Sequence, residues 1–179
     1  MAIKISLTKG FLPPDEAEQI FDECLEQIPF EDMYWGNGIL KRKVYEYDYS
    51  SNYLKRAFNH ECEKIPVLDD LINRISEHIN ETIVSAVCNY YRDGSDYSPS
   101  HQDDSGFDLC ILSLGGTREV VLTSLTDNSV SKYTLSNGDL FFFNQVANAT
   151  YKHSIPKKNN AEPRISLVFH IAPPLEFDI

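Results

Sequence analysis

Closely spaced cysteines and long apolar runs are both missing from this sequence. The four cysteines, Cys24, Cys62, Cys88 and Cys110, lie far apart and form no CxxC pair, which argues against a zinc site or a dense disulfide framework and predicts buried free thiols. No run is long and apolar enough to span a bilayer, and the start, MAIKISLTKGFLPP, lacks the apolar segment of a signal peptide. We therefore expect no membrane association and a location inside the cell, in the cytoplasm or, in a eukaryote, the nucleus.

Positive charge is also scarce. The chain has 16 Lys and Arg against 27 Asp and Glu, a net charge of −11. Affinity for nucleic acid comes largely from cations that neutralise phosphates, so the protein is expected to bind a long duplex only weakly. Two local clusters remain, Lys41-Arg42-Lys43 and the lysines 152, 157 and 158 around His153. They fit either phosphate contacts or ordinary solvated lysines.

The order of the patterns predicts a helix-backed antiparallel sandwich. With 179 residues, 42% of them hydrophobic, the chain suits one domain over 1–179. Helical spacing follows Pro13-Pro14-Asp15 and returns from Pro66 to Asn80. After it come short β-rich runs without βαβ alternation: 83–91, 107–114, 117–125, 130–135, 140–144 and 164–171. We expect an α+β jelly roll, as a monomer, with helices and a substrate lid in 1–82 and the catalytic core in 83–179.

The sequence His101-Gln102-Asp103 is the first candidate for chemistry. In an extended segment, residues two apart share a face, so this imidazole and this carboxylate can converge on one metal ion while Gln102 points away. Two such ligands hold a metal poorly, and His153 is the candidate third donor. Taken singly, His153 also fits a surface residue of a lysine-rich loop, and Asp103 a turn residue.

Ordered segments around these residues resemble the AlkB family of iron(II)- and 2-oxoglutarate-dependent dioxygenases. They are NYY at 89–91, DG at 93–94, HQDD at 101–104, LSNGDL at 135–140, HSIPK at 153–157 and PRISLVF at 163–169, with a weaker match in KVYEYDYSS at 43–51. HxD alone is a weak signal, whereas several segments in family order are hard to obtain by chance. The resemblance implies a double-stranded β-helix, with Fe(II), 2-oxoglutarate and O2 as cofactor and cosubstrates.

The resemblance assigns the metal ligands, which are also the candidate catalytic residues. His101, Asp103 and His153 would form the set of two histidines and one carboxylate that occupies one face of an octahedron and leaves positions open on iron(II). A structural zinc site would instead close all four of its positions, often with thiolates. No cysteine lies near these residues in the sequence.

The resemblance also assigns the cosubstrate site. Arg164 would pair with the distal carboxylate of 2-oxoglutarate, with Tyr91 and Ser166 as hydrogen-bond partners, while Asn89 would lie near the carboxylate that chelates iron. The alternative for Arg164 is a salt bridge to one of the many acids. His170 departs from the family, which usually has a second arginine there, and an imidazole offers fewer donors than a guanidinium. This departure puts the affinity for the cosubstrate in question more than its identity.

The expected reaction is oxidative demethylation of N-alkylated bases in DNA or RNA, single-stranded or extruded from a duplex. Trp35 and Tyr47 are candidate lid aromatics that stack on a base, and Asp104 a candidate partner for its exocyclic amino group. Core-covering aromatics and a solvated loop acid are the alternatives. Two other functions stay open: a 2-oxoglutarate-dependent hydroxylase or demethylase of a protein side chain, free nucleotide or other small molecule, and a non-catalytic jelly-roll binding module.

Overall fold

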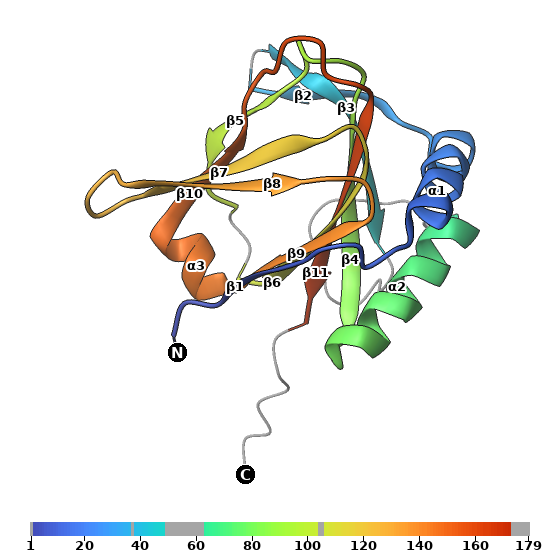
Figure 1. The fold of residues 1–179 in the computed structure, drawn as a ribbon, viewed down its shortest axis with the longest axis horizontal. Helices are drawn as coiled ribbons and strands as arrows, with labels where there is room; N and C mark the ends of the chain where they lie inside the picture. Colours follow the sequence, from blue (N-terminus) through green and yellow to red (C-terminus); the bar gives the residue numbers. More distant parts are fainter. Residues whose placement is uncertain (1, 37, 49–62, 104–105, 173–179) are drawn as a thin grey trace.

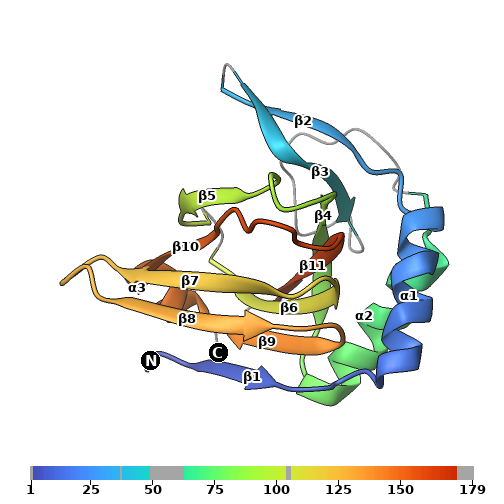
Figure 2. The same ribbon diagram turned by 45° about the horizontal axis from the view of Figure 1, so that its top comes forward.

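Two antiparallel sheets face each other in the computed structural model, which describes residues 2–36, 38–48, 63–103 and 106–172 (Figures 1 and 2). The large sheet has the strand order β1-β9-β6-β11-β4-β3-β2, and the small sheet has the order β5-β10-β7-β8. Apolar side chains from both sheets fill the space between them, among them Leu109 and Phe143 from the large sheet and Val120 and Leu122 from the small one.

The strands are β1 (Ile5–Thr8), β2 (Glu31–Trp35), β3 (Gly38–Asp48), β4 (Ile83–Tyr91), β5 (Ser98–His101), β6 (Asp108–Gly115), β7 (Arg118–Ser124), β8 (Val130–Leu135), β9 (Asp139–Phe143), β10 (Tyr151–Ile155) and β11 (Arg164–Ile171). The helices are α1 (Pro14–Gln27), α2 (Pro66–Ile79) and α3 (Gln145–Thr150). Among the described residues, no helix is long and apolar enough to cross a membrane.

Helices α1 and α2 cover the outer face of the large sheet, and the short α3 lies at the other end of the molecule (Figures 1 and 2). Each long helix begins with proline in its first turn, where a missing N–H costs nothing. Helix α2 is capped at its C-terminal end by Asn80, which adopts the left-handed conformation. The buried stripe of α2, which includes Leu68, Leu71 and Ile75, packs on the sheet and leaves the opposite face of that sheet free for a site.

The predicted fold class is confirmed. The segments predicted at 83–91, 130–135 and 164–171 coincide with β4, β8 and β11, and the second predicted helix coincides with α2 to within one residue. Residues 1–82 contribute more than helices, because β1, β2 and β3 are strands of the large sheet itself. The N-terminal part therefore builds one wall of the molecule and is continuous with the core.

Candidate metal and cosubstrate site

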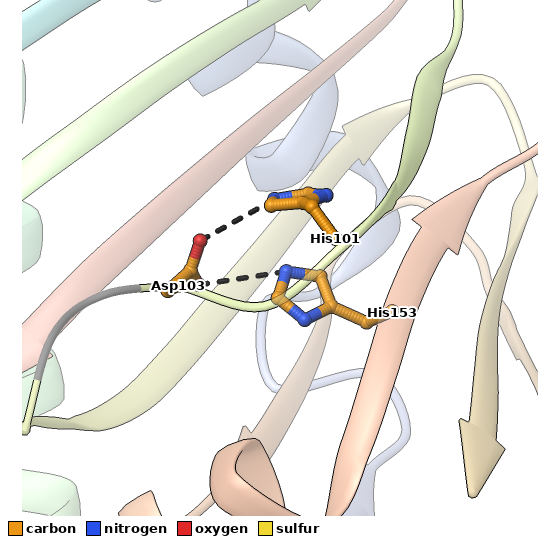
Figure 3. A group of neighbouring side chains, drawn as sticks. All are labelled: His101, Asp103 and His153. Atoms are coloured by element: carbon orange, nitrogen blue, oxygen red, sulfur yellow. Dashed lines mark ion pairs between the residues drawn. The ribbon is translucent and has the colours of Figure 1, made fainter. Parts of the chain in front are cut away.

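Antiparallel pairing of β5 with β10 creates the centre of the site. In this pairing His101 lies directly opposite His153, and Asp103 follows β5 by two residues. Figure 3 shows the three side chains converging. Asp103 Oδ1 lies 3.3 Å from His101 Nε2, and Asp103 Oδ2 lies 3.4 Å from His153 Nε2. Three donor atoms, one from each residue, lie within 4.8 Å of one another, a spacing that one ion can bridge.

Hydrogen bonding and burial prepare these groups for a cation. The Nδ1–H of His101 donates to the Pro99 carbonyl at 2.8 Å, which leaves Nε2 as the nitrogen that faces the carboxylate. The Asp103 carboxylate raises the pKa of His101. Burial lowers the pKa of His153 to about 4, so this ring is held in the neutral form that binds metals. Burial acts to raise the pKa of Asp103, but His101 and His153 outweigh it and the pKa is lowered.

The Asn148 side chain forms two hydrogen bonds to the backbone of Asp103, contacts that the sequence did not predict. Its Nδ2 donates to the Asp103 carbonyl at 2.8 Å, and its Oδ1 accepts from the Asp103 N–H at 3.3 Å. The Gln102 side chain donates to the Asn148 carbonyl at 2.9 Å. Asn148 is buried in α3, directly before the strand that carries His153. It therefore ties the two halves of the ligand set together.

Replacing Asn148 with alanine is expected to weaken metal binding roughly 10- to 100-fold, because the Asp103 loop loses the contact that orients it. Titration of the metal-free protein with Mn(II) measures the change. Asn73→Ala on the exposed side of α2 is the matched control and should bind as the unsubstituted protein does. Equal Mn(II) affinity in Asn148→Ala and Asn73→Ala would show that the Asn148–Asp103 hydrogen bonds contribute nothing to metal binding.

Arg164 is a buried guanidinium with an unused donor face. The residue is 0% exposed, and its Nε donates to Ser113 Oγ at 2.9 Å. Within the described part of the chain, its Nη1 and Nη2 have no hydrogen-bond partner. Burial lowers its pKa to about 10. An unpaired charge is costly to bury, and a carboxylate that accepts from both terminal nitrogens would remove that cost. The predicted alternative, a salt bridge from Arg164 to a protein acid, does not appear among the described residues.

Tyr91 lies between two buried arginines. The centroid of its ring is 5.4 Å from the Cζ of Arg164 and 5.4 Å from the Cζ of Arg118. Arg118 was not predicted. It is 1% exposed and donates to the carbonyls of Asp96 and Pro156, so it fixes the segments next to the ligand strands. Two guanidinium groups around one phenol make this end of the interior strongly attractive to an anion.

The other predicted cosubstrate residues share a face with Arg164. Strand β11 pairs with β4 so that Arg164 is opposite Tyr91, Ser166 opposite Asn89 and His170 opposite Ser85. Asn89 and Ser166 are both buried. Because residues two apart on a strand face the same way, all of these side chains lie toward the small sheet and its histidines.

His170 makes its own local contacts. Its Nδ1 lies 2.9 Å from Ser85 Oγ, and its ring lies 5.6 Å from that of Phe107. Burial lowers its pKa. His170, which stands where the family usually has an arginine, is therefore an imidazole bonded to Ser85 and supplies no permanent positive charge.

The prediction that Tyr47 contacts substrate is wrong. Tyr47 pairs with Ala86, whose side chain faces the helices, and Tyr47 is 3% exposed. Its hydroxyl donates to Asp69 of α2 at 2.5 Å. The alternation of β3 places this phenol on the face opposite the metal ligands. Trp35 ends β2, but its side chain lies outside the described part of the structure, as does all of Asp104.

These side chains fit a metal ion and a dicarboxylic acid together. Two imidazoles and one carboxylate are the donor set of mononuclear iron(II) oxygenases, and they leave positions open for other ligands. The terminal nitrogens of Arg164, which have no partner among the described residues, would be satisfied by a carboxylate bound in the same interior. The fold and the site thus define an iron-dependent oxygenase that uses a small diacid.

Comparison with known proteins agrees with this class. The model of the 2OG-Fe(II) oxygenase superfamily matches residues 4–169, and the chain belongs to this superfamily. The cofactor and cosubstrates of the superfamily are Fe(II), 2-oxoglutarate and O2.

Its relatives are AlkB homologues, as the sequence motifs indicated. The chain is 26% identical over 193 residues to the alpha-ketoglutarate-dependent dioxygenase alkB homolog 3 of Mus musculus, an alignment that covers 96% of this chain and 67% of that protein. It is 29% identical over 119 residues to the DNA oxidative demethylase ALKBH2 of Bos taurus, covering 59% of this chain and 43% of the relative. The chain thus spans about two thirds of the first relative and less than half of the second.

Solved structures share the fold. OsALKBH1 superposes with a TM-score of 0.67 at 18% identity and covers 95% of this chain and 99% of its own. An oxidoreductase of the 2OG-Fe(II) oxygenase family from Burkholderia pseudomallei gives a TM-score of 0.64 at 13% identity, covering 94% of this chain and 85% of its own.

Proposed function

We propose that this protein is an oxygenase that oxidatively demethylates N-alkylated bases of nucleic acid, with His101, Asp103 and His153 as its iron(II) ligands. The main support for this proposal is Arg164, whose terminal nitrogens have no hydrogen-bond partner among the described residues. Its guanidinium lies in the same interior as the triad and supplies the positive charge that a diacid cosubstrate requires. Iron with 2-oxoglutarate and O2 supplies an oxidant for unactivated C–H bonds. When an N-methyl group is hydroxylated, the product loses formaldehyde and leaves the base demethylated.

The protein's own residues position the reactants and exclude water. Arg164, oriented by Ser113, holds the distal carboxylate of the cosubstrate, and the Tyr91 ring packs beside the Arg164 guanidinium. Phe143 packs against the His153 ring at a centroid distance of 5.5 Å. These apolar and hydrogen-bonded walls leave the exposed side of His101 as the side from which a substrate approaches, since its side chain is 38% exposed against 14% for His153.

Nucleic acid as the substrate class is supported by the relatives and by local charge. The ALKBH2 relative is named for DNA oxidative demethylation. Around the ligand strand, the Tyr97 N–H donates to the Lys41 carbonyl at 2.9 Å, and Lys157 lies over the Tyr97 ring at 5.1 Å. An exposed lysine thus lies over an aromatic ring directly before β5, an arrangement suited to a phosphate and a base of a single strand.

The net charge of −11 favours a second candidate. An acidic protein repels a long polyanion, so a methylated protein side chain, a free nucleotide or another small molecule is the alternative substrate. The converging ligand set argues against the non-catalytic module. We further propose that the enzyme is a monomer and acts inside the cell, where the buried thiols of Cys24 and Cys110 would stay reduced.

The direct test is incubation of the iron-loaded protein with 2-oxoglutarate, oxygen and a single-stranded oligonucleotide that carries one N-methylated base. We expect succinate and formaldehyde in equal amounts, with loss of one methyl group from the oligonucleotide by mass spectrometry. Asp103→Ala serves as the inactive control. The same assay is run with N-methylated nucleotides and methyl-lysine peptides.

Formaldehyde released only from nucleotides or peptides would replace the nucleic-acid proposal with the second candidate. Absence of succinate in every arm, from a folded and iron-loaded protein, would refute the oxygenase function of this chain. Salt titration of oligonucleotide binding adds an independent measure, because phosphate contacts make the affinity fall steeply with salt.

A further inference from the structure

Strand β5 contains one residue more than its partner β10 between their two paired positions. Ser98 lies opposite Ile155 and His101 lies opposite His153, so three steps along β5 match two steps along β10. This register shift is a β-bulge, a feature that re-aims side chains next to active sites. Pro99 suits it, because proline has no N–H to donate and is tolerated in sheets at edge strands and bulges, and β5 is the edge strand of the small sheet.

The bulge decides which residue of β5 faces His153. Regular pairing from Ser98 onward would place Ser100 opposite His153 and would turn His101 to the other face of the small sheet. With the bulge, the rings of His101 and His153 lie on one face, with their centroids 4.3 Å apart. Strand β5 has only four residues, so its own ladder is short. The bulged register therefore depends on contacts outside the strand.

Arg118 makes such contacts at the ends of both ligand strands. Its buried guanidinium donates from Nη2 to the Asp96 carbonyl at 2.8 Å and to the Pro156 carbonyl at 2.6 Å, and from Nη1 to the Asp93 carbonyl at 3.4 Å. Asp96 precedes β5 by two residues, and Pro156 directly follows β10. One side chain on β7 thus joins the two strands on the side of the bulge away from the histidines.

The loops that carry these carbonyls also contact each other closely. The Lys158 N–H donates to the Gly94 carbonyl at 3.0 Å, and Lys158 Nζ donates to the Thr117 carbonyl at 2.8 Å. A methyl group at position 94 would overlap the Lys158 carbonyl, so this approach requires glycine. Beyond the other end of β5, Asn148 holds the backbone of Asp103. The bulge is therefore held from both sides, and its extra residue is retained between them.

We propose that Arg118 is a positioning residue for the metal site. By holding Asp96 and Pro156 together it preserves the bulge in β5, and the bulge places His101 opposite His153. Arg118 needs no contact with metal or cosubstrate for this role. The inference rests on the proposed function, because it concerns the proposed iron ligands, but the register that Arg118 sets can be measured without a metal.

The first test is titration of the metal-free protein with Mn(II). Arg118→Met is expected to bind Mn(II) roughly 10- to 100-fold more weakly, the range for loss of a contact that orients metal ligands. Arg118→Lys should fall between Arg118→Met and the unsubstituted protein, since lysine keeps the charge without the guanidinium fork. Gly94→Ala, which keeps Arg118 but forces the two loops apart, should weaken binding as well.

Two variants serve as matched controls. Tyr47→Phe removes a buried hydroxyl that donates to Asp69 on the helical side of the large sheet, so it lowers stability away from the ligands. Gly38→Ala adds a methyl group where no other atom lies within 4 Å. Both are expected to bind Mn(II) as the unsubstituted protein does, whatever their thermal unfolding midpoints.

The second test reads the register in the metal-free protein by NMR. The rings of His101 and His153 are close enough for a nuclear Overhauser effect between their protons, and the chain has only five histidines to assign. This effect is expected in the unsubstituted protein and in Tyr47→Phe. It should be lost in Arg118→Met and in Gly94→Ala, because the two rings no longer lie opposite each other.

A folded Arg118→Met protein with a lower unfolding midpoint but unchanged Mn(II) affinity and an unchanged ring contact would overturn the proposal. Arg118 would then stabilise the fold alone. If Arg118→Met does not fold, Arg118→Lys and Gly94→Ala are judged by the same two measurements. If the unsubstituted protein shows the ring contact but binds no Mn(II), the proposed function fails at its metal site, whereas the ring contact in the variants still decides whether Arg118 sets the register.

Discussion

Replacing His153 with alanine is expected to lower metal affinity by more than about 100-fold and to abolish turnover. His153 is the least exposed member of the proposed ligand set, and the two that remain, His101 and Asp103, sit on one face and hold an ion poorly. Metal titration, followed by measurement of iron content after reconstitution, checks the result. The protein should still fold, because the substitution leaves the backbone pairing of β10 with β5 and β7 in place.

His78→Ala is the matched control for this experiment. His78 lies on α2 and contacts Phe11 at a ring centroid distance of 4.9 Å, on the other side of the large sheet. Its loss should leave metal content and turnover unchanged. Full metal occupancy in His153→Ala would remove the triad from the proposal, even though its donor atoms converge.

Replacing Arg164 with methionine is expected to separate cosubstrate binding from folding. Methionine fills a similar volume without a charge, so it removes an unpaired buried guanidinium and should leave the cosubstrate-free protein equally stable or more stable. The affinity for 2-oxoglutarate should fall by about 100-fold or more, because a bidentate ion pair is lost. Metal binding should persist.

Thermal unfolding with and without 2-oxoglutarate measures both effects at once. The cosubstrate should raise the midpoint of the unsubstituted protein and leave that of Arg164→Met unchanged, since a ligand stabilises only the state it binds. Arg74→Met is the control, because Arg74 forms a surface ion pair with Glu16 on the helical side. A variant of Arg164 that is destabilised yet binds 2-oxoglutarate normally would assign the guanidinium a purely structural role.

The local patterns of the chain were sufficient to predict its strongest elements and to single out two members of the candidate metal site. The apolar stripe after Pro66 predicted α2, and short β-rich runs predicted β4, β8 and β11, because these patterns depend only on which residues must face an apolar layer. The spacing of His101 and Asp103 likewise predicted that their side chains share one face, because alternate residues of an extended segment face the same way. The short elements β5, β10 and α3 were not predicted as such, because their lengths give no clear period.

Only the tertiary structure decided which face each strand presents and which distant residues meet. Tyr47 alternates as expected, but the pairing of β3 with β4 turns it toward α2 and turns Arg42 toward Asn89 on the opposite face. Asn148, Ser113 and Arg118 became visible only through contacts with residues far along the chain. A strand's sequence sets its alternation, whereas its register against neighbours is fixed by the packing of the whole sheet, and a shift of one residue exchanges its two faces.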